Sequence, residues 1–141
     1  MAEAEQSILI HAPIKAVYDV VADFESYPEF QPEVKKVSLH KKGKAVLADF
    51  EVSLIKTVRY TIKLNMKPHS KIEWSFVSGD FFKDNHGGWT FEEEGKNKTR
   101  ATYKIEVEVG MFIPSMVVKK LVAQNLPSML EKFKKRIERR K

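Results

Sequence analysis

Residues 57–67, TVRYTIKLNMK, decide the fold class of this 141-residue chain. Apolar and polar side chains alternate along the whole stretch, and the apolar set is Val58, Tyr60, Ile62, Leu64 and Met66. A period of two is that of a β-strand, because successive side chains of a strand point to opposite faces of a sheet. The stretch therefore predicts a strand with one buried and one solvated face, as in an antiparallel sheet.

The same alternation extends in both directions, over most of residues 34–109. Short turns such as KKGK, PHSK and EGKNK separate the alternating runs, and such turns join antiparallel neighbours. Further strands are predicted at residues 34–40, 45–54, 72–78, 87–94 and 99–109, with a first strand at 3–11. Together they predict a curled antiparallel sheet of seven strands.

Three segments have helical patterns instead. Pro13 opens a helix whose apolar residues follow a spacing of three to four up to Phe24, and Pro28 and Pro32 then bracket a short aromatic segment with room for a turn or two of helix. Residues 115–137 predict a long amphipathic helix, which Pro127 should kink or split. We therefore expect one α+β domain over residues 1–141, with two short helices between the first two strands. One helix cannot fill the concave face of a curved sheet, so a cavity between them is expected.

Residues 78–91, SGDFFKDNHGGWTF, look like a catalytic or metal-binding loop. Asp80, Asp84 and His86 could gather there, but the chain's four histidines are scattered and no metal-binding, nucleophile or phosphate-loop motif is present. We interpret the stretch as the end of one strand, a hairpin loop and the start of the next strand, with turn residues at Gly79, Asp84, Asn85, Gly87 and Gly88. No metal, no cofactor and no catalytic residue are predicted.

The net charge of +6 is concentrated at one end of the chain. Residues 131–141 hold seven Lys or Arg against two Glu, whereas the rest of the chain is nearly neutral. This distribution does not indicate a specific nucleic-acid-binding face, although a weak contact of the basic terminus with an anionic membrane or a ribosome stays open. No apolar stretch approaches a membrane span, the N-terminus does not have the pattern of a signal peptide, and cysteine is absent, so a cytoplasmic protein is predicted.

Several motifs, spread over nearly the whole chain, give the sequence a family resemblance. They are FxxYPxFxPxV at residues 24–34, the Gly and aromatic pattern from Gly79 to Phe91, TxxTY at residues 99–103, and prolines with leucines from Pro114 to Leu130. The chain resembles the polyketide cyclase/dehydrase and lipid-transport family of the START-like, helix-grip superfamily (SRPBCC). The segment at residues 24–34 is similar to the coenzyme Q-binding branch and the related ribosome-association toxin branch. The resemblance implies a helix-grip fold with an apolar ligand held between the sheet and the C-terminal helix.

The side chains that the predicted strands direct toward the core indicate binding rather than catalysis. Their only polar groups are phenols and indoles, and none of these titrates near neutral pH in its unperturbed form. We therefore predict a protein that binds a lipid, an isoprenoid quinone or a polycyclic aromatic for transport, delivery or sequestration, driven by burial of apolar surface. A cyclase or dehydrase acting on an aromatic polyketide-like substrate, or a ribosome-associated interaction protein, are the alternatives.

The predicted ligand-binding residues come from the sheet, the strand ends and the long helix. The sheet contributes Tyr60, Ile62, Trp74, Phe76, Trp89 and Tyr103. The helix contributes Met116, Leu121 and Met129. Phe81, Phe82 and Phe112, which are apolar at strand ends, are predicted as an entrance lid.

Overall fold

A computed structural model of the chain describes residues 2–54, 56–110 and 114–139, with the side chains of 115 and 121 outside the description. The elements follow the predicted order of strand, helix, short helix, six strands and long helix. The first four are β1 (Ala2–Ile10), helix α1 (Ile14–Ala22), the 3-10 helix η1 (Phe24–Glu29) and β2 (Val34–Lys42). They are followed by β3 (Ala45–Ser53), β4 (Thr57–Lys67), β5 (Lys71–Gly79), β6 (Phe82–Gly95), β7 (Lys98–Val109) and helix α2 (Ser115–Arg139).

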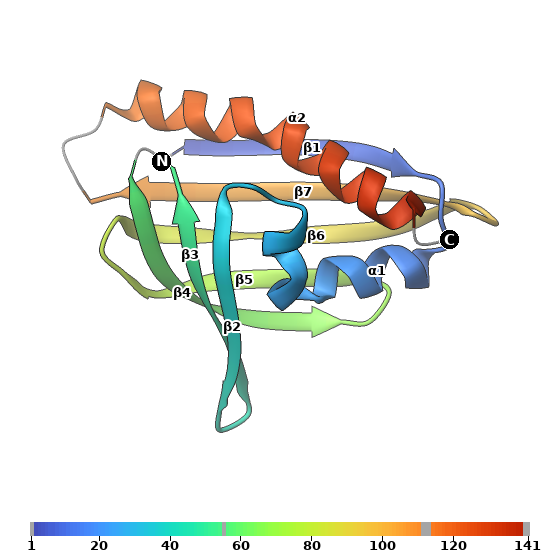
Figure 1. The fold of residues 1–141 in the computed structure, drawn as a ribbon, viewed down its shortest axis with the longest axis horizontal. Coiled ribbons are helices and arrows are strands. Elements are labelled where there is room, and N and C mark those ends of the chain that lie inside the picture. Colours follow the sequence, from blue (N-terminus) through green and yellow to red (C-terminus); the bar gives the residue numbers. More distant parts are fainter. Residues whose placement is uncertain (1, 55, 111–113, 140–141) are drawn as a thin grey trace.

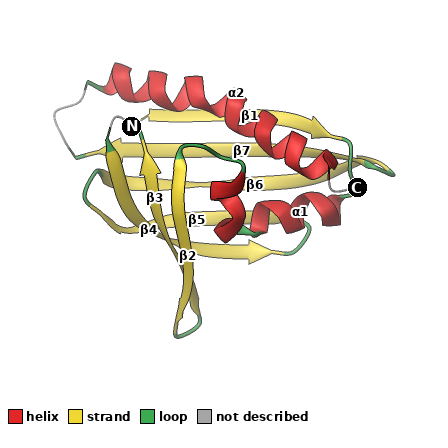
Figure 2. Cartoon of the chain, in the orientation of Figure 1, coloured by secondary structure: helices red, strands yellow, loops and turns green. Residues whose placement is uncertain are grey.

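The seven strands form one sheet in the order β1-β7-β6-β5-β4-β3-β2, and every neighbouring pair is antiparallel. β2 to β7 are a meander, and β1 closes the order by pairing with β7 (Figure 1). Figure 2 shows the helices gathered on one side of the strongly curled strands, with α2 lying along β1. This confirms the α+β architecture expected from the alternating pattern and the helix-grip arrangement that the family resemblance implies.

The core lies between the sheet and these helices. Helix α2 contributes a stripe of buried residues at the spacing of three to four that places side chains on one helical face: Leu126, Leu130, Phe133 and Ile137. α1 adds a shorter stripe from Val17 to Val21. Aromatic rings fill the junction, because the Phe133 ring lies 5.1 Å from the rings of Tyr27, Phe30 and Trp89.

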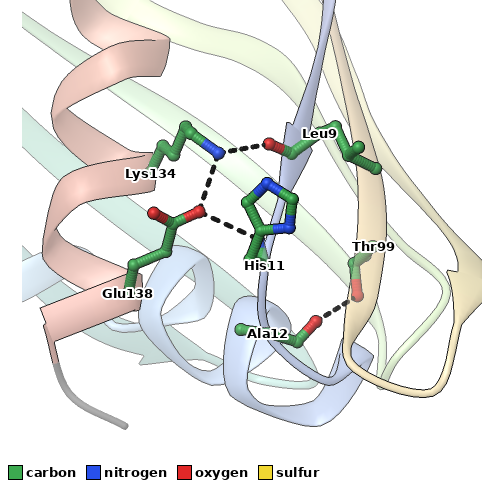
Figure 3. A network of polar contacts seen from close by, with 6 residues as sticks. All are labelled: Leu9, His11, Ala12, Thr99, Lys134 and Glu138. Atoms are coloured by element: carbon green, nitrogen blue, oxygen red, sulfur yellow. Dashed lines mark hydrogen bonds and ion pairs between the residues drawn. The ribbon is translucent and has the colours of Figure 1, made fainter.

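Polar contacts attach the C-terminal end of α2 to the chain between β1 and α1 (Figure 3). Lys134 donates hydrogen bonds to the Leu9 carbonyl and to Glu138, and Glu138 also accepts one from the backbone N–H of His11. Burial opposes ionisation of Glu138, but these two hydrogen bonds and the attraction of the nearby Lys134 charge together lower the pKa of the carboxyl group. The ionised form is therefore the one that the folded state favours.

Two details differ from the prediction. α2 is a single helix that runs unbroken past Pro127, so it is not split there. β6 begins at Phe82 rather than at residue 87, so the loop predicted between the strands at residues 79–86 is wrong, and only a short bend at residues 80–81 joins β5 to β6. No helix in the described ranges is long and apolar enough to cross a membrane.

Candidate ligand cavity

A cavity of about 230 Å³ lies between the inner face of the sheet, η1 and α2. Its lining is mostly apolar, and aromatic residues contribute much of it. An engineered apolar cavity of about 150 Å³ takes up benzene, whereas drug-sized ligands occupy roughly 300–1,000 Å³. The cavity therefore has room for a compact molecule of one or two rings, or for the head of a longer one.

Most residues predicted to bind a ligand line this cavity. They are Tyr60, Ile62, Trp74, Phe81, Phe82, Trp89, Tyr103 and Met129. Phe81 is buried and Phe82 is half-buried against the Tyr60 ring, so both belong to the wall. Binding by these residues stays a prediction, since the structure shows only where their side chains lie.

Two other predicted residues lie elsewhere. Met116 is 71% exposed, because it is two positions from Val118, and two positions turn a helix by about 200°. Phe76 is half-buried and pairs with Ile62, beside a shift in the β4–β5 register, and it is not part of the lining. Phe112 and the side chain of Leu121 lie outside the described residues.

Aromatic pairs build the wall of the cavity. The Tyr103 ring lies 5.4 Å from Trp74 and 4.9 Å from Trp89, and the Phe50 ring stacks on Tyr60 at 5.2 Å. Burial raises the pKa of two of the three lining phenols described, Tyr60 and Tyr103, above the ordinary value of 10.0, and the third, Tyr27, already donates a hydrogen bond to the Val21 carbonyl. The hydroxyl groups of Tyr60 and Tyr103 are therefore neutral hydrogen-bond donors at physiological pH.

Asn85 is a polar lining residue that the sequence did not reveal, since we interpreted it as part of a turn. It is 3% exposed, and its Oδ1 accepts a hydrogen bond of 3.0 Å from the indole N–H of Trp74. Gly87 of β6 is the direct partner of Trp74 in β5, and Asn85 lies two positions before Gly87 on the same face of β6. Because Gly87 has no side chain, nothing stands between the indole and Asn85. Counting back by twos from Trp89 would have placed Asn85 on the inner face.

Gln31, in the segment after η1, is the second buried polar residue that was missed. It is 2% exposed, and its Nε2 donates a hydrogen bond of 3.0 Å to the Met129 carbonyl of α2. Its Oε1 is fully covered and has no hydrogen-bond partner among the described residues. Gln31 therefore ties η1 to the helix that closes the cavity.

The charge at the cavity is sparse. Among the described lining residues, the half-buried Glu33 is the only acidic residue, and none is Lys, Arg or His. Asn125 lines the cavity and is also exposed, so the cavity approaches the surface beside α2. The lining has apolar walls, a few neutral polar groups and one carboxylate.

The suspected Asp80, Asp84 and His86 cluster is only partly assembled. His86 contacts Asp84 at 2.9 Å and Glu106 of β7 at 3.0 Å, and none of these residues is part of the cavity lining. Asp80 is exposed in the bend before β6. In the described part of the chain, no group of three or more His, Asp or Glu side chains is arranged to hold a metal ion.

The basic C-terminal segment is partly neutralised within the fold. Lys134 pairs with Glu138, and Arg136 pairs with Glu29 of η1 while its guanidinium lies 5.0 Å over the Phe30 ring. Lys135 and Arg139 are exposed on α2. Two of the segment's basic residues therefore help to attach the helix to the rest of the fold.

Comparisons with known proteins agree with this architecture. The ribosome association toxin RatA of Pseudomonas aeruginosa is 24% identical over 132 residues, covering 92% of this chain and 90% of that protein. A START superfamily protein from Mycobacterium smegmatis superposes with a TM-score of 0.90 at 19% identity, with full coverage of both chains. The Zhui aromatase/cyclase from Streptomyces sp. R1128 has a TM-score of 0.88 at 17% identity, over 98% of this chain and 94% of that one.

The similarity to the two solved structures supports the fold, and the match to a family model defines the family. The family model described as polyketide cyclase/dehydrase and lipid transport matches residues 10–134, which is most of the chain. The chain is therefore a member of the polyketide cyclase/dehydrase and lipid-transport family.

Proposed function

We propose that this protein binds a hydrophobic small molecule between the sheet and α2, for transport, delivery or sequestration. The observation that carries the proposal is the cavity of about 230 Å³ with its apolar and aromatic lining. Burial of apolar ligand surface contributes about 25 cal/mol per Å², so a ligand that buries ~200 Å² gains about 5 kcal/mol before the cost of association. A neutral ligand fits best, because Glu33 is the only charged residue in the described lining.

Binding is favoured over cyclase or dehydrase chemistry by the groups that face the cavity. A cyclase or dehydrase needs an acid or base whose pKa lies near the working pH. Burial raises the pKa of Tyr60 and Tyr103 away from neutrality, and neither has a basic partner in the described lining. These phenols suit hydrogen bonding to a bound molecule.

Native mass spectrometry of the protein purified from its own host tests the proposal. Val118 of α2 is buried in the lining, whereas the neighbouring Val117 is 42% exposed, so the same substitution at each position gives a matched pair. We expect a bound small molecule on the wild type and on Val117→Phe, and a reduced or absent adduct on Val118→Phe. Equal occupancy of both variants would show that the adduct lies outside the cavity.

Ribosome association is a second candidate function. It is favoured by the similarity to the ribosome association toxin RatA over 92% of this chain. The exposed Lys135 and Arg139 are the basic residues to test, because deletion of the terminus would also remove the core residues Phe133 and Ile137. Co-sedimentation with ribosomes should be lost in a Lys135→Glu, Arg139→Glu double variant, and unchanged co-sedimentation would exclude this contact.

A further inference from the structure

The cavity contains hydrogen-bond donors that have no acceptor in the described part of the chain. We infer that the ligand is a neutral ring compound held by an oxygen atom that accepts hydrogen bonds beside Trp74, from Asn85 and Tyr103. This inference rests on the proposed function and specifies the polar group that such a ligand needs. It follows from the orientation of one buried amide and from the surroundings of one phenol.

The orientation of the Asn85 amide is determined by its neighbour. An indole nitrogen can only donate, so the atom 3.0 Å from Trp74 Nε1 must be the amide oxygen. The amide nitrogen, Nδ2, is then the other end of the group; no described residue is paired with it, and it is not among the fully covered atoms that lack a partner, so it keeps accessible surface. Because Asn85 is 3% exposed and lines the cavity, this donor has the cavity in front of it.

Tyr103, whose ring lies against the Trp74 ring, provides the second donor. Its ring is 5.4 Å from the Trp74 ring and 4.9 Å from the Trp89 ring, so the phenol belongs to the same end of the cavity as Asn85. Tyr103 is half-buried, no described residue is paired with its hydroxyl, and the hydroxyl is not among the fully covered atoms that lack a partner, so it keeps surface toward the cavity that its ring lines. Burial raises its pKa, so the hydroxyl keeps its proton.

The two buried amides of the described lining offer a ligand no free acceptor. Asn85 Oδ1 is already paired with Trp74, and the covered Oε1 of Gln31 is inaccessible to a ligand. Both donors lose contact with water when a ligand enters the cavity, so a ligand oxygen that accepts their hydrogen bonds is selected over a hydrocarbon edge. A ketone, quinone or ether oxygen has this property, and a carboxylate would have to enter beside Glu33 without a cation in the described lining.

A matched pair of probes of suitable size separates this inference from simple apolar binding. 1-Tetralone has two fused rings and one acceptor oxygen, and tetralin has the same rings without the oxygen. Both of the protein's tryptophans line the cavity, so the fluorescence of Trp74 and Trp89 reports binding directly. Each probe is titrated into the wild type and into Tyr103→Phe, which removes the hydroxyl and keeps the ring.

We expect Tyr103→Phe to raise the Kd for 1-tetralone by about 3- to 10-fold, which is the effect of losing one hydrogen bond. The same substitution should change the Kd for tetralin by less than about twofold. Tyr18→Phe is the control, since Tyr18 is buried but outside the described lining, and it should change neither Kd. Asn85→Leu should act like Tyr103→Phe on 1-tetralone. The infrared carbonyl band of 1-tetralone bound to the wild type, which needs no variant, should lie at lower frequency than in a hydrocarbon solvent.

The outcomes separate the two proposals. If neither probe binds the wild type, the proposed function fails for compact ring compounds and the inference fails with it. If tetralin binds but Tyr103→Phe affects both probes equally, or the carbonyl band is unshifted, the cavity binds apolar molecules and the donor subsite is wrong. A selective loss of 1-tetralone together with a shifted band establishes the subsite.

Discussion

Substitution of Thr99 by valine should destabilise the protein by removing one buried hydrogen bond. Thr99 in β7 and Ala12 before α1 are both completely buried, and the threonine hydroxyl donates to the Ala12 carbonyl at 2.8 Å (Figure 3). Valine keeps the shape of the side chain but replaces the hydroxyl group by a methyl group. The Ala12 carbonyl would then be buried without this partner.

The expected cost follows from this geometry. A buried polar group left without a partner destabilises the folded state by about 1–3 kcal/mol. For a chain of this length, that loss corresponds to a decrease in Tm of roughly 3–10 °C. Urea unfolding monitored by circular dichroism measures the change in the free energy of unfolding directly.

Thr102→Val is the matched control, because it makes the same change in the same strand. The Thr102 hydroxyl shares a hydrogen bond of 2.7 Å with Ser7 at an exposed position of the sheet, where water can replace the lost partner. We expect this variant to stay within about 0.5 kcal/mol of the wild type. Equal unfolding free energies for Thr99→Val and Thr102→Val would refute the reasoning that burial of the Ala12 carbonyl sets the cost.

Three further predictions concern close backbone packing and ionisation. Gly87→Ala should destabilise the fold by at least about 2 kcal/mol in urea unfolding, because the new Cβ would lie 2.1 Å from the backbone oxygen of Lys104. Gly95→Ala should be nearly neutral, because the nearest atom to its new Cβ would lie at an ordinary contact distance of 3.7 Å. Equal effects of the two substitutions would contradict this prediction. Glu138→Gln should lower the unfolding free energy at pH 7, because the folded state favours the ionised carboxyl group. The difference from the wild type should shrink below pH 4.5, as the pH falls through the lowered pKa of Glu138 in the folded state. A difference that stays constant down to about pH 2 would contradict the ionised contact. The raised pKa values of Tyr60 and Tyr103 predict that stability falls above about pH 10, because these phenols ionise there in the unfolded chain but not in the folded one. A Tyr60→Phe, Tyr103→Phe double variant should lose less stability over the same pH range, and urea unfolding at alkaline pH measures the difference. An equal loss in the wild type and the double variant would contradict this prediction.

Alternation and helical spacing were sufficient to predict the order of the elements, since each strand keeps one face toward the core. The segment before Trp89 was misjudged because glycine and asparagine are typical of turns. In the structure, Gly87 is required by close approach of the Lys104 backbone, and Asn85 is required by the Trp74 indole. Both needs arise from neighbouring strands, so the local sequence does not show them.

The cavity could be predicted only in part, for a similar reason. The sheet residues Tyr60, Trp74 and Tyr103 follow from the strand phase, and the structure places them in the lining. Gln31 contributes through the curl of the sheet and the packing of η1 against α2, which no periodicity encodes. Met116 was placed inward although it lies on the opposite side of the helix from Val118, which only the docking of α2 reveals.

The most direct test of ligand binding follows the indole N–H signals of Trp74 and Trp89, the chain's only tryptophans, in a ¹H–¹⁵N NMR titration with tetralin. Both side chains line the cavity, so a neutral hydrocarbon that enters it must change the surroundings of both indoles. We predict that the two signals shift together and saturate at one tetralin per protein in the wild type, and that Val118→Phe weakens the response. If both indole signals stay unmoved up to the solubility limit of tetralin, the claim that this cavity binds hydrophobic molecules is contradicted.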